Sequence, residues 1–246
     1  MLDLRNFEVL TFDCYGTLID WPAGILGVLR PFRDAHGIDA SDDEMLAAYA
    51  RAEAHIQRSY FRSYSEVQRE VMKNLAVHYR VAPGSFDEDT LSKALPSWKP
   101  YDDTNAALET LSQYYRLVIL SNIDDDLFAD TAKHFTVRFD DVITAQQVGA
   151  YKPAFKMFRT AKDRIGVHPS RILHVAQSLF HDIKPAKSLD WHAVWVDRMG
   201  EEAGGATHPG YAQPDLIVPD LDTLAAMVQE QLGDPVPRAR QEHFYI

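Results

Sequence analysis

Short apolar runs alternate with amphipathic stretches along most of the chain. The first run, residues 9–12, is rich in β-branched and aromatic residues and leads into a glycine-containing turn, so it predicts a buried strand. Runs of the same kind predict further strands at residues 117–120, 142–144, 172–175, 193–196 and 216–218. The stretches around them predict helices at residues 104–115, 127–135, 154–165, 185–189 and 221–232. The alternation predicts an α/β fold, a doubly wound parallel sheet with helices on both faces.

One long segment interrupts this alternation. Residues 21–98 contain helical periods, such as the amphipathic stretch 64–79, and no good strand pattern. Residues 96–100, with a proline at each end, predict a linker. We therefore expect a core domain formed by residues 1–20 and 99–246, with a helical cap domain, residues 21–98, inserted after the first strand. The expected loops and extensions are Gly204-Gly205 and the chain from Gly233 onward.

Composition and charge narrow the classes of partner. The chain has 246 residues, a formal net charge of −11 and 46% apolar residues, which is typical of a globular protein. The acidic balance argues against nucleic acid as a partner, because surfaces that bind phosphate backbones are basic. No apolar run approaches a membrane span, and the first residues do not read as a signal peptide. With Cys14 as the only cysteine, we expect a cytoplasmic protein that packs this thiol as a small apolar group.

Candidate chemistry gathers after the predicted strands. Polar side chains follow the first, second and fourth strands, and a lysine stands before the helix that follows the third; they are Asp13, Tyr15, Thr17, Ser121, Asn122, Lys152, Gln177, Ser178, His181 and Asp182. Each has an ordinary structural explanation, such as a turn or helix cap. Together they predict one site, because the carboxyl ends of parallel strands meet at one edge of the sheet.

These motifs resemble those of the haloacid dehalogenase superfamily. The resemblance rests on Asp-x-Tyr-Gly-Thr-Leu from Asp13 to Leu18, on Ser121-Asn122, on Tyr151-Lys152-Pro153 and on the helical insert, and it covers nearly the whole chain. Within the superfamily the chain is most similar to the type II (S)-2-haloacid dehalogenases. The resemblance implies a Rossmann-like core, an active site between core and cap, and a homodimer as a possible assembly.

Two positions separate the classes of this superfamily. Its phosphatases usually carry a second Asp two residues after the nucleophile, where this chain has Tyr15, and a phenol with a pKa of about 10 is a poor proton shuttle at neutral pH. Gln177 stands where those phosphatases carry an Asp that helps to hold Mg²⁺. We therefore expect no cofactor and no metal site, with Mg²⁺ only under the alternative of a phosphatase.

The resemblance implies a mechanism in two displacements. Asp13 attacks C2 of a small anionic 2-substituted carboxylic acid, expels halide and forms an ester, which water hydrolyses to a 2-hydroxy acid. It implies that Lys152 keeps Asp13 ionised and that Asn122 donates to the halide. The expected contacts to carboxylate oxygens come from Thr17, Ser121 and Ser178.

Several assignments stay open at this level. Arg51 is the preferred arginine for the leaving halide, with Arg58 and Arg62 as rivals. Asp182 or His181 activates the water. Trp21 shapes the pocket or packs under the cap, and Phe158 stands where the type II enzymes usually have Tyr. The same Asp13 chemistry on fluoroacetate, or on a C–N bond of a small cyclic amino acid, is the alternative activity, and a non-catalytic binding protein is the alternative class.

Overall fold

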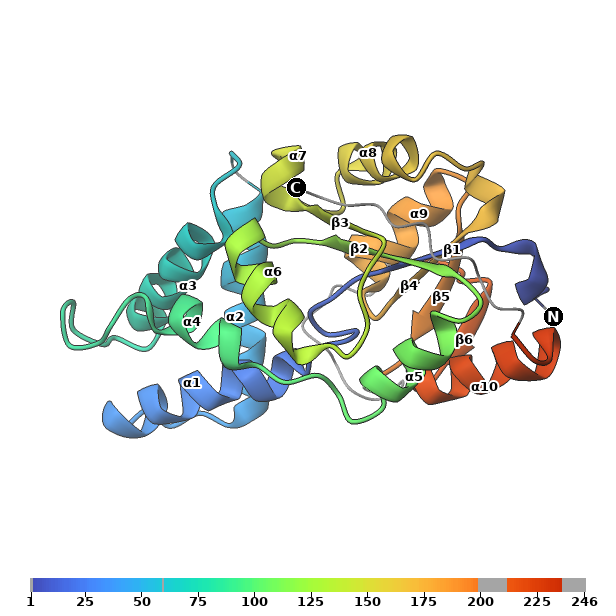
Figure 1. The fold of residues 1–246 in the computed structure, drawn as a ribbon. Coiled ribbons are helices and arrows are strands. Elements are labelled where there is room, and N and C mark those ends of the chain that lie inside the picture. The colour runs from blue at the N-terminus through green and yellow to red at the C-terminus, as the bar shows by residue number, and fades with distance from the viewer. Residues whose placement is uncertain (1, 59, 199–211, 236–246) are drawn as a thin grey trace.

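Six parallel strands form one sheet in the order β3-β2-β1-β4-β5-β6 (Figure 1). The structure is a computed structural model that describes residues 2–58, 60–198 and 212–235. The strands are β1 (Val9–Phe12), β2 (Arg116–Ser121), β3 (Asp141–Thr144), β4 (Ile172–Ala176), β5 (His192–Val196) and β6 (Leu216–Val218). The prediction of a doubly wound parallel sheet is confirmed, and no strand end moves by more than one residue.

Two layers of helices cover the sheet (Figure 1). One face carries α5 (Thr104–Leu111) and α10 (Leu221–Leu232), which pack against each other, and the other carries α8 (Phe155–Ile165) and α9 (Lys184–Ser188). The connections add α6 (Asp125–Thr131) and α7 (Ala145–Val148). The predicted helices 104–115 and 127–135 end early, at α5 and α6, because each closes in turns or a 3-10 segment. The four-residue α7 is too short to have a helical period in the sequence.

Residues 21–98 form a helical insert beside the sheet. It consists of α1 (Trp21–Ala35), α2 (Asp42–Gln57), α3 (Tyr64–His78) and α4 (Thr90–Ala94). Ser41 and Ser63 cap α2 and α3, each through a reciprocal pair of bonds with the glutamate three residues later. The insert lies near the carboxyl ends of the strands (Figure 1). Its separation from the core as a domain of its own stays a prediction, since buried residues of both parts share one apolar cluster.

The strand order places the start of the chain at the centre of the sheet. β1 pairs with β2 on one side and with β4 on the other, so the direction of winding reverses at this strand. Ligands of open α/β sheets bind at such a switch point, outside the carboxyl ends of the strands. The residues after Phe12, Leu120 and Ala176 therefore share this edge.

Two sequence expectations concern other parts of the chain. Among the helices that the structure describes, none is both long and apolar enough to cross a membrane. The Gly204-Gly205 loop and the tail beyond residue 235 lie outside the described residues.

Candidate active site

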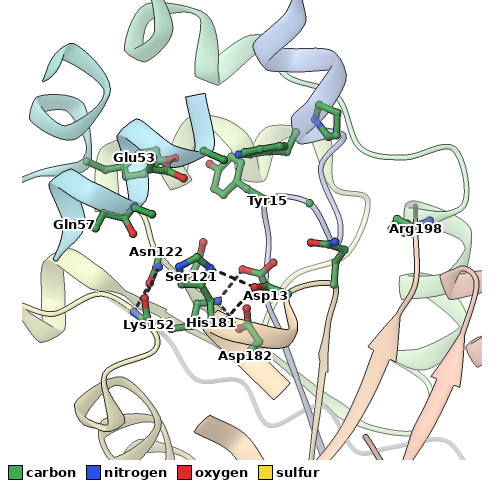
Figure 2. Close-up of a pocket in the computed structure, with 18 of the residues that line it drawn as sticks. Asp13, Tyr15, Glu53, Gln57, Ser121, Asn122, Lys152, His181, Asp182 and Arg198 are labelled. Carbon is green, nitrogen blue, oxygen red and sulfur yellow. Dashed lines mark hydrogen bonds and ion pairs between the residues drawn. The ribbon is translucent and has the colours of Figure 1, made fainter. Parts of the chain in front are cut away.

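Asp13 lies at the end of β1, directly beside a buried lysine (Figure 2). Lys152 Nζ donates to Asp13 Oδ1 at 2.7 Å, to Asp182 Oδ1 at 2.7 Å and to the carbonyl oxygen of Leu120 at 2.8 Å. Three acceptors use all three protons of the ammonium group. Lys152 is only 2% exposed, so its charge is neutralised by the two carboxylates and not by water.

Thr17 fixes the second oxygen of the Asp13 carboxylate. Its Oγ1 donates to Asp13 Oδ2 at 2.7 Å and accepts the backbone N–H of Gln177 at 2.9 Å. The turn that brings Thr17 back to Asp13 passes through Gly16 at φ +95°, a conformation that favours glycine. The hydroxyl predicted to bind substrate therefore orients Asp13 and ties the ends of β1 and β4 together.

Burial and charge shift the pKa values of the three charged groups. Burial raises the pKa of Asp13, while Lys152 and Thr17 oppose that rise. Burial would lower the pKa of Lys152, but the two carboxylates outweigh it and the pKa is raised. Burial would likewise raise the pKa of Asp182, yet Lys152 and His174 bring it down to about 2. Lys152 is thus held charged, and Asp182 is held ionised.

A buried histidine, His174, forms a hydrogen bond with Asp182. His174 Nε2 lies 3.0 Å from Asp182 Oδ1, and His174 Nδ1 lies 2.8 Å from Thr11 Oγ1. A carboxylate oxygen only accepts, so Nε2 carries a proton that it donates to Asp182. Phe158 packs edge-on against the imidazole, with ring centroids 5.4 Å apart. The sequence analysis missed His174, because it lies inside an apolar strand rather than after it.

Ser121 and Asn122, at the end of β2, differ in how many of their hydrogen-bonding groups are available to a ligand. Ser121 Oγ is buried and has no hydrogen-bond partner among the residues that the structure describes, although Ser121 lines the cavity. Asn122 pairs with the backbone of Lys152: its Oδ1 accepts the N–H at 2.7 Å and its Nδ2 donates to the carbonyl at 3.2 Å. Ser121 is therefore an available donor, whereas Asn122 keeps one amide proton for a ligand.

His181 and Ser178 lie together after β4. Ser178 Oγ accepts the backbone N–H of His181 at 3.0 Å and lies 3.2 Å from His181 Nδ1. Burial lowers the pKa of His181 to about 4, with Lys152 contributing and Asp182 opposing. The imidazole is therefore neutral at neutral pH. Ser178, His181 and Asp182 all line the cavity.

Aromatic side chains close another part of the cavity. The Tyr15 hydroxyl lies 2.7 Å from Thr131 Oγ1, so it is engaged there and the ring lines the cavity. Trp21 lines the same cavity and packs edge-on against Tyr49 of α2, with ring centroids 5.4 Å apart. It therefore contacts both the cavity and the helical insert. Cys14 is fully buried and packs in the apolar core, as expected.

The structure does not bring Arg51 to the other predicted residues. The cavity is lined by one face of α2, formed by Ala50, Glu53, Ala54 and Gln57 at helical spacing. Arg51 is rotated off that face and exposed to solvent. The expectation that Arg51 binds the leaving group is therefore wrong. Arg58 lies near a neighbouring hollow, and Arg62 is absent from the lining of this cavity.

The sequence analysis also missed two charged residues of the cavity, Arg198 and Glu53. Arg198 lies two residues after β5 at the same sheet edge, a signal that was available in the sequence. Its Nη1 donates to Asp103 at 2.7 Å and its Nη2 to the Thr17 carbonyl at 2.8 Å. The sequence did not indicate Glu53, because it does not show which face of the helix that carries Glu53 points into the cavity.

The donor set does not suit a magnesium ion. Asp13 Oδ1 and Asp182 Oδ1 both accept from Lys152 Nζ, so a cation already occupies the position between the carboxylates. Gln177 offers a neutral amide where a third carboxylate would be needed. Across the part of the chain that the structure describes, no three His, Cys, Asp or Glu side chains are grouped to hold a metal.

Comparison with known proteins bears on this geometry. A family model described as haloacid dehalogenase-like hydrolase matches residues 7–190. The haloacetate dehalogenase H-2 of Moraxella sp. (strain B) is 23% identical over 234 residues, 92% of this chain and 99% of that protein. The (S)-2-haloacid dehalogenase 4A of Burkholderia cepacia is 26% identical over 203 residues, 79% of this chain and 85% of that protein.

Solved structures share the fold. The L-2-haloacid dehalogenase from Xanthobacter autotrophicus superposes with a TM-score of 0.76 at 21% identity, covering 91% of this chain and 98% of that one. At 21% identity this similarity shows a shared fold, that is, the same arrangement of sheet and insert.

Proposed function

The chain belongs to the haloacid dehalogenase-like hydrolases, and on that premise we propose that it displaces halide from C2 of a small 2-substituted carboxylic acid. The observation that carries the proposal is the Asp13 carboxylate, which faces a cavity while Lys152 and Thr17 hold its two oxygens. Asp13 Oδ attacks C2, the carbon–halogen bond breaks with its electron pair on the halide, and an aspartyl ester forms. The names of the relatives support halide as the leaving group.

Substrate binding follows from the free polar atoms of the cavity. Ser121 Oγ, which lacks a partner, donates to the substrate carboxylate. Asn122 donates its remaining amide proton toward the halide. Such donors matter because a departing anion is stabilised by preorganised dipoles in a site that excludes water.

Water then attacks the carbonyl carbon of the ester, freeing Asp13 and a 2-hydroxy acid. Asp182 and His181 both line the cavity and both can accept a proton from that water. Asp182 is ionised because its pKa is about 2, and His181 is neutral because its pKa is about 4. Single-turnover kinetics of Asp182→Asn and His181→Asn separate them, since the variant that lacks the base accumulates the ester.

A phosphatase fits this cavity less well. A phosphate dianion would meet the carboxylates of Asp13, Asp182 and Glu53, and the donor set around Asp13 does not suit the Mg²⁺ that would balance them. Tyr15 offers a phenol whose pKa burial raises well above its ordinary value, so it is a weak general acid.

The test is halide release from 2-chloropropionate and from fluoroacetate in the presence of EDTA. Wild-type protein should release halide from at least one of them, and Asp13→Asn should release none. Mass spectrometry of the wild type quenched during turnover in H₂¹⁸O should find ¹⁸O in Asp13, because water attacks the ester carbonyl. Absence of halide from both acids would refute the proposal, and phosphate release that needs Mg²⁺ would replace it.

We also propose a cytoplasmic enzyme with no cofactor. The cytoplasmic location rests on the single, buried cysteine, which offers no internal disulfide. A homodimer stays a prediction that sedimentation velocity would decide.

A further inference from the structure

Glu53 is an acidic side chain at the position where an expelled anion would need a positive one. It projects from α2 on the side of the cavity opposite the cluster of Asp13, Lys152 and Asp182 (Figure 2). Displacement proceeds in line, so the leaving group departs away from Asp13 and toward this side. A carboxylate there repels halide and attracts a cation.

The hydrogen bonds around Glu53 converge on one oxygen of its carboxyl group. The Tyr49 hydroxyl lies 3.2 Å from Glu53 Oε1 and 3.0 Å from Gln68 Oε1, so these two oxygens share its one proton. The Tyr64 hydroxyl donates to Glu53 Oε1 at 2.7 Å. These donors hold the side chain in place through Oε1. Oε2 has no hydrogen bond within the described residues, and it is not among the fully buried atoms that lack a partner. Because Glu53 lines the cavity, we assign Oε2 as the oxygen that faces it.

Within the described part of the chain, Glu53 has no cationic partner. Among the described residues, no lysine, arginine or histidine forms an ion pair with Glu53. Of the basic residues that line the cavity, Lys152 is used by two carboxylates and Arg198 is paired with Asp103. The cavity therefore has a net negative charge. Burial raises the pKa of Glu53 accordingly, although the two tyrosines oppose that rise.

We propose that Glu53 binds a protonated amine of the substrate, so that the enzyme acts on a small zwitterion in preference to a simple haloacid. The ammonium group lies against Glu53 Oε2, and the carboxylate lies against Ser121 Oγ. This assignment rests on the proposed function for the position of the reacting carbon, but the binding itself is independent of any reaction.

Binding of unreactive probes tests the assignment directly. Titration calorimetry on the wild type compares 3-aminopropionate, 4-aminobutyrate and 5-aminopentanoate, each with the matched alkanoate that lacks the amine. At least one amino acid should bind on the order of 10- to 100-fold more tightly than its alkanoate, as expected for a charge-assisted hydrogen bond in a buried site. Equal binding within all three pairs would overturn the proposal.

Two variants locate the effect at residue 53. Glu53→Gln should abolish the preference without weakening alkanoate binding, because the amide keeps the volume, can still accept from Tyr64 and no longer repels an anion. Glu53→Asp should keep the preference but shift it to a longer amino acid, since its carboxylate is one methylene shorter. Glu70→Gln is the matched control, an exposed position of α3 that makes the same change of charge. A preference that persists in Glu53→Gln would refute the role of Glu53.

A catalytic comparison separates this inference from the proposed function. Wild-type protein should release chloride from 4-amino-2-chlorobutyrate at least about tenfold faster, in kcat/KM, than from 2-chlorobutyrate. Chloride from both at equal rates would overturn the ammonium site and support the dehalogenase. Preferred binding of amino acids without chloride release would do the opposite.

Discussion

Replacing Lys152 with Met probes the charge balance on which the site depends. Met keeps the length of the side chain and removes the ammonium group. Asp13 and Asp182, whose side chains are 11% and 1% exposed, then lose their shared cation. Leaving buried charges without their partner costs about 3–5 kcal/mol of the free energy of unfolding. The total for a domain is about 5–15 kcal/mol, so we expect a folded but weakened protein.

The loss should depend on pH in a definite direction. In the wild type the pKa of Asp182 is about 2, below its unfolded value of about 3.9, so its stabilising contribution is lost only as pH falls through that range. In Lys152→Met, burial without a cation raises the folded pKa of both carboxyl groups above the unfolded value. The penalty is then present at neutral pH and disappears as the groups become protonated. The two proteins should differ most at neutral pH and least near pH 4.

Urea unfolding at about pH 7.5 and about pH 4 measures this difference. Lys133→Met is the control, because its ammonium group is exposed on the surface, and it should change the free energy of unfolding little at either pH. A loss of less than about 1 kcal/mol at neutral pH, or a loss of equal size at both pH values, would show that Lys152 does not hold the two carboxylates ionised. Residual turnover should be far below wild type.

Four further changes address single groups of the cavity. Ser121→Ala should raise KM several-fold while barely changing urea unfolding, because its hydroxyl has no protein partner. Tyr15→Phe should cost about 1 kcal/mol in the same unfolding assay, through the lost bond to Thr131, and leave kcat within a few-fold of wild type. Because the pKa of His181 is about 4, the pH–rate profile should show no limb from it between pH 6 and 8, and His181→Asn should keep the wild-type profile shape there. Arg51→Ala should leave kcat and KM unchanged, since the residue is exposed.

The sequence predicted the candidate site best where a reactive or polar residue stands at the end of a strand. Asp13 and Ser121 each end a run whose burial and period are plain in the sequence, and parallel strands bring such ends together. Lys152 was found through its motif. β2 lies between β3 and β1, so the Lys152 side chain, which follows β3 and α7, crosses the end of β2 to reach Asp13. On the way its Nζ donates to the carbonyl oxygen of Leu120.

Side chains on helices and inside strands were harder to assign. A helix rotates by about 100° for each residue, so Arg51 and Glu53 on α2 face different directions although both are charged. His174 lies within an apolar strand, and only the pairing of β4 with β1 reveals Thr11 on one side of its ring. Such positions depend on packing between segments far apart in the chain, which local patterns do not encode.

The two sides of the cavity therefore have different origins and different tasks. The sheet edge supplies Asp13, Lys152 and Asp182, whose mutual bonds leave little freedom for change, because removing Lys152 leaves two buried carboxylates without their cation. α2 supplies Glu53, whose inner oxygen is held by tyrosines while the outer one meets the ligand. A substitution on α2 can alter the charge presented to the substrate without disturbing the nucleophile. In the proposed function the strand ends therefore carry the reaction, and in the proposed ammonium site the helical insert carries the choice of substrate.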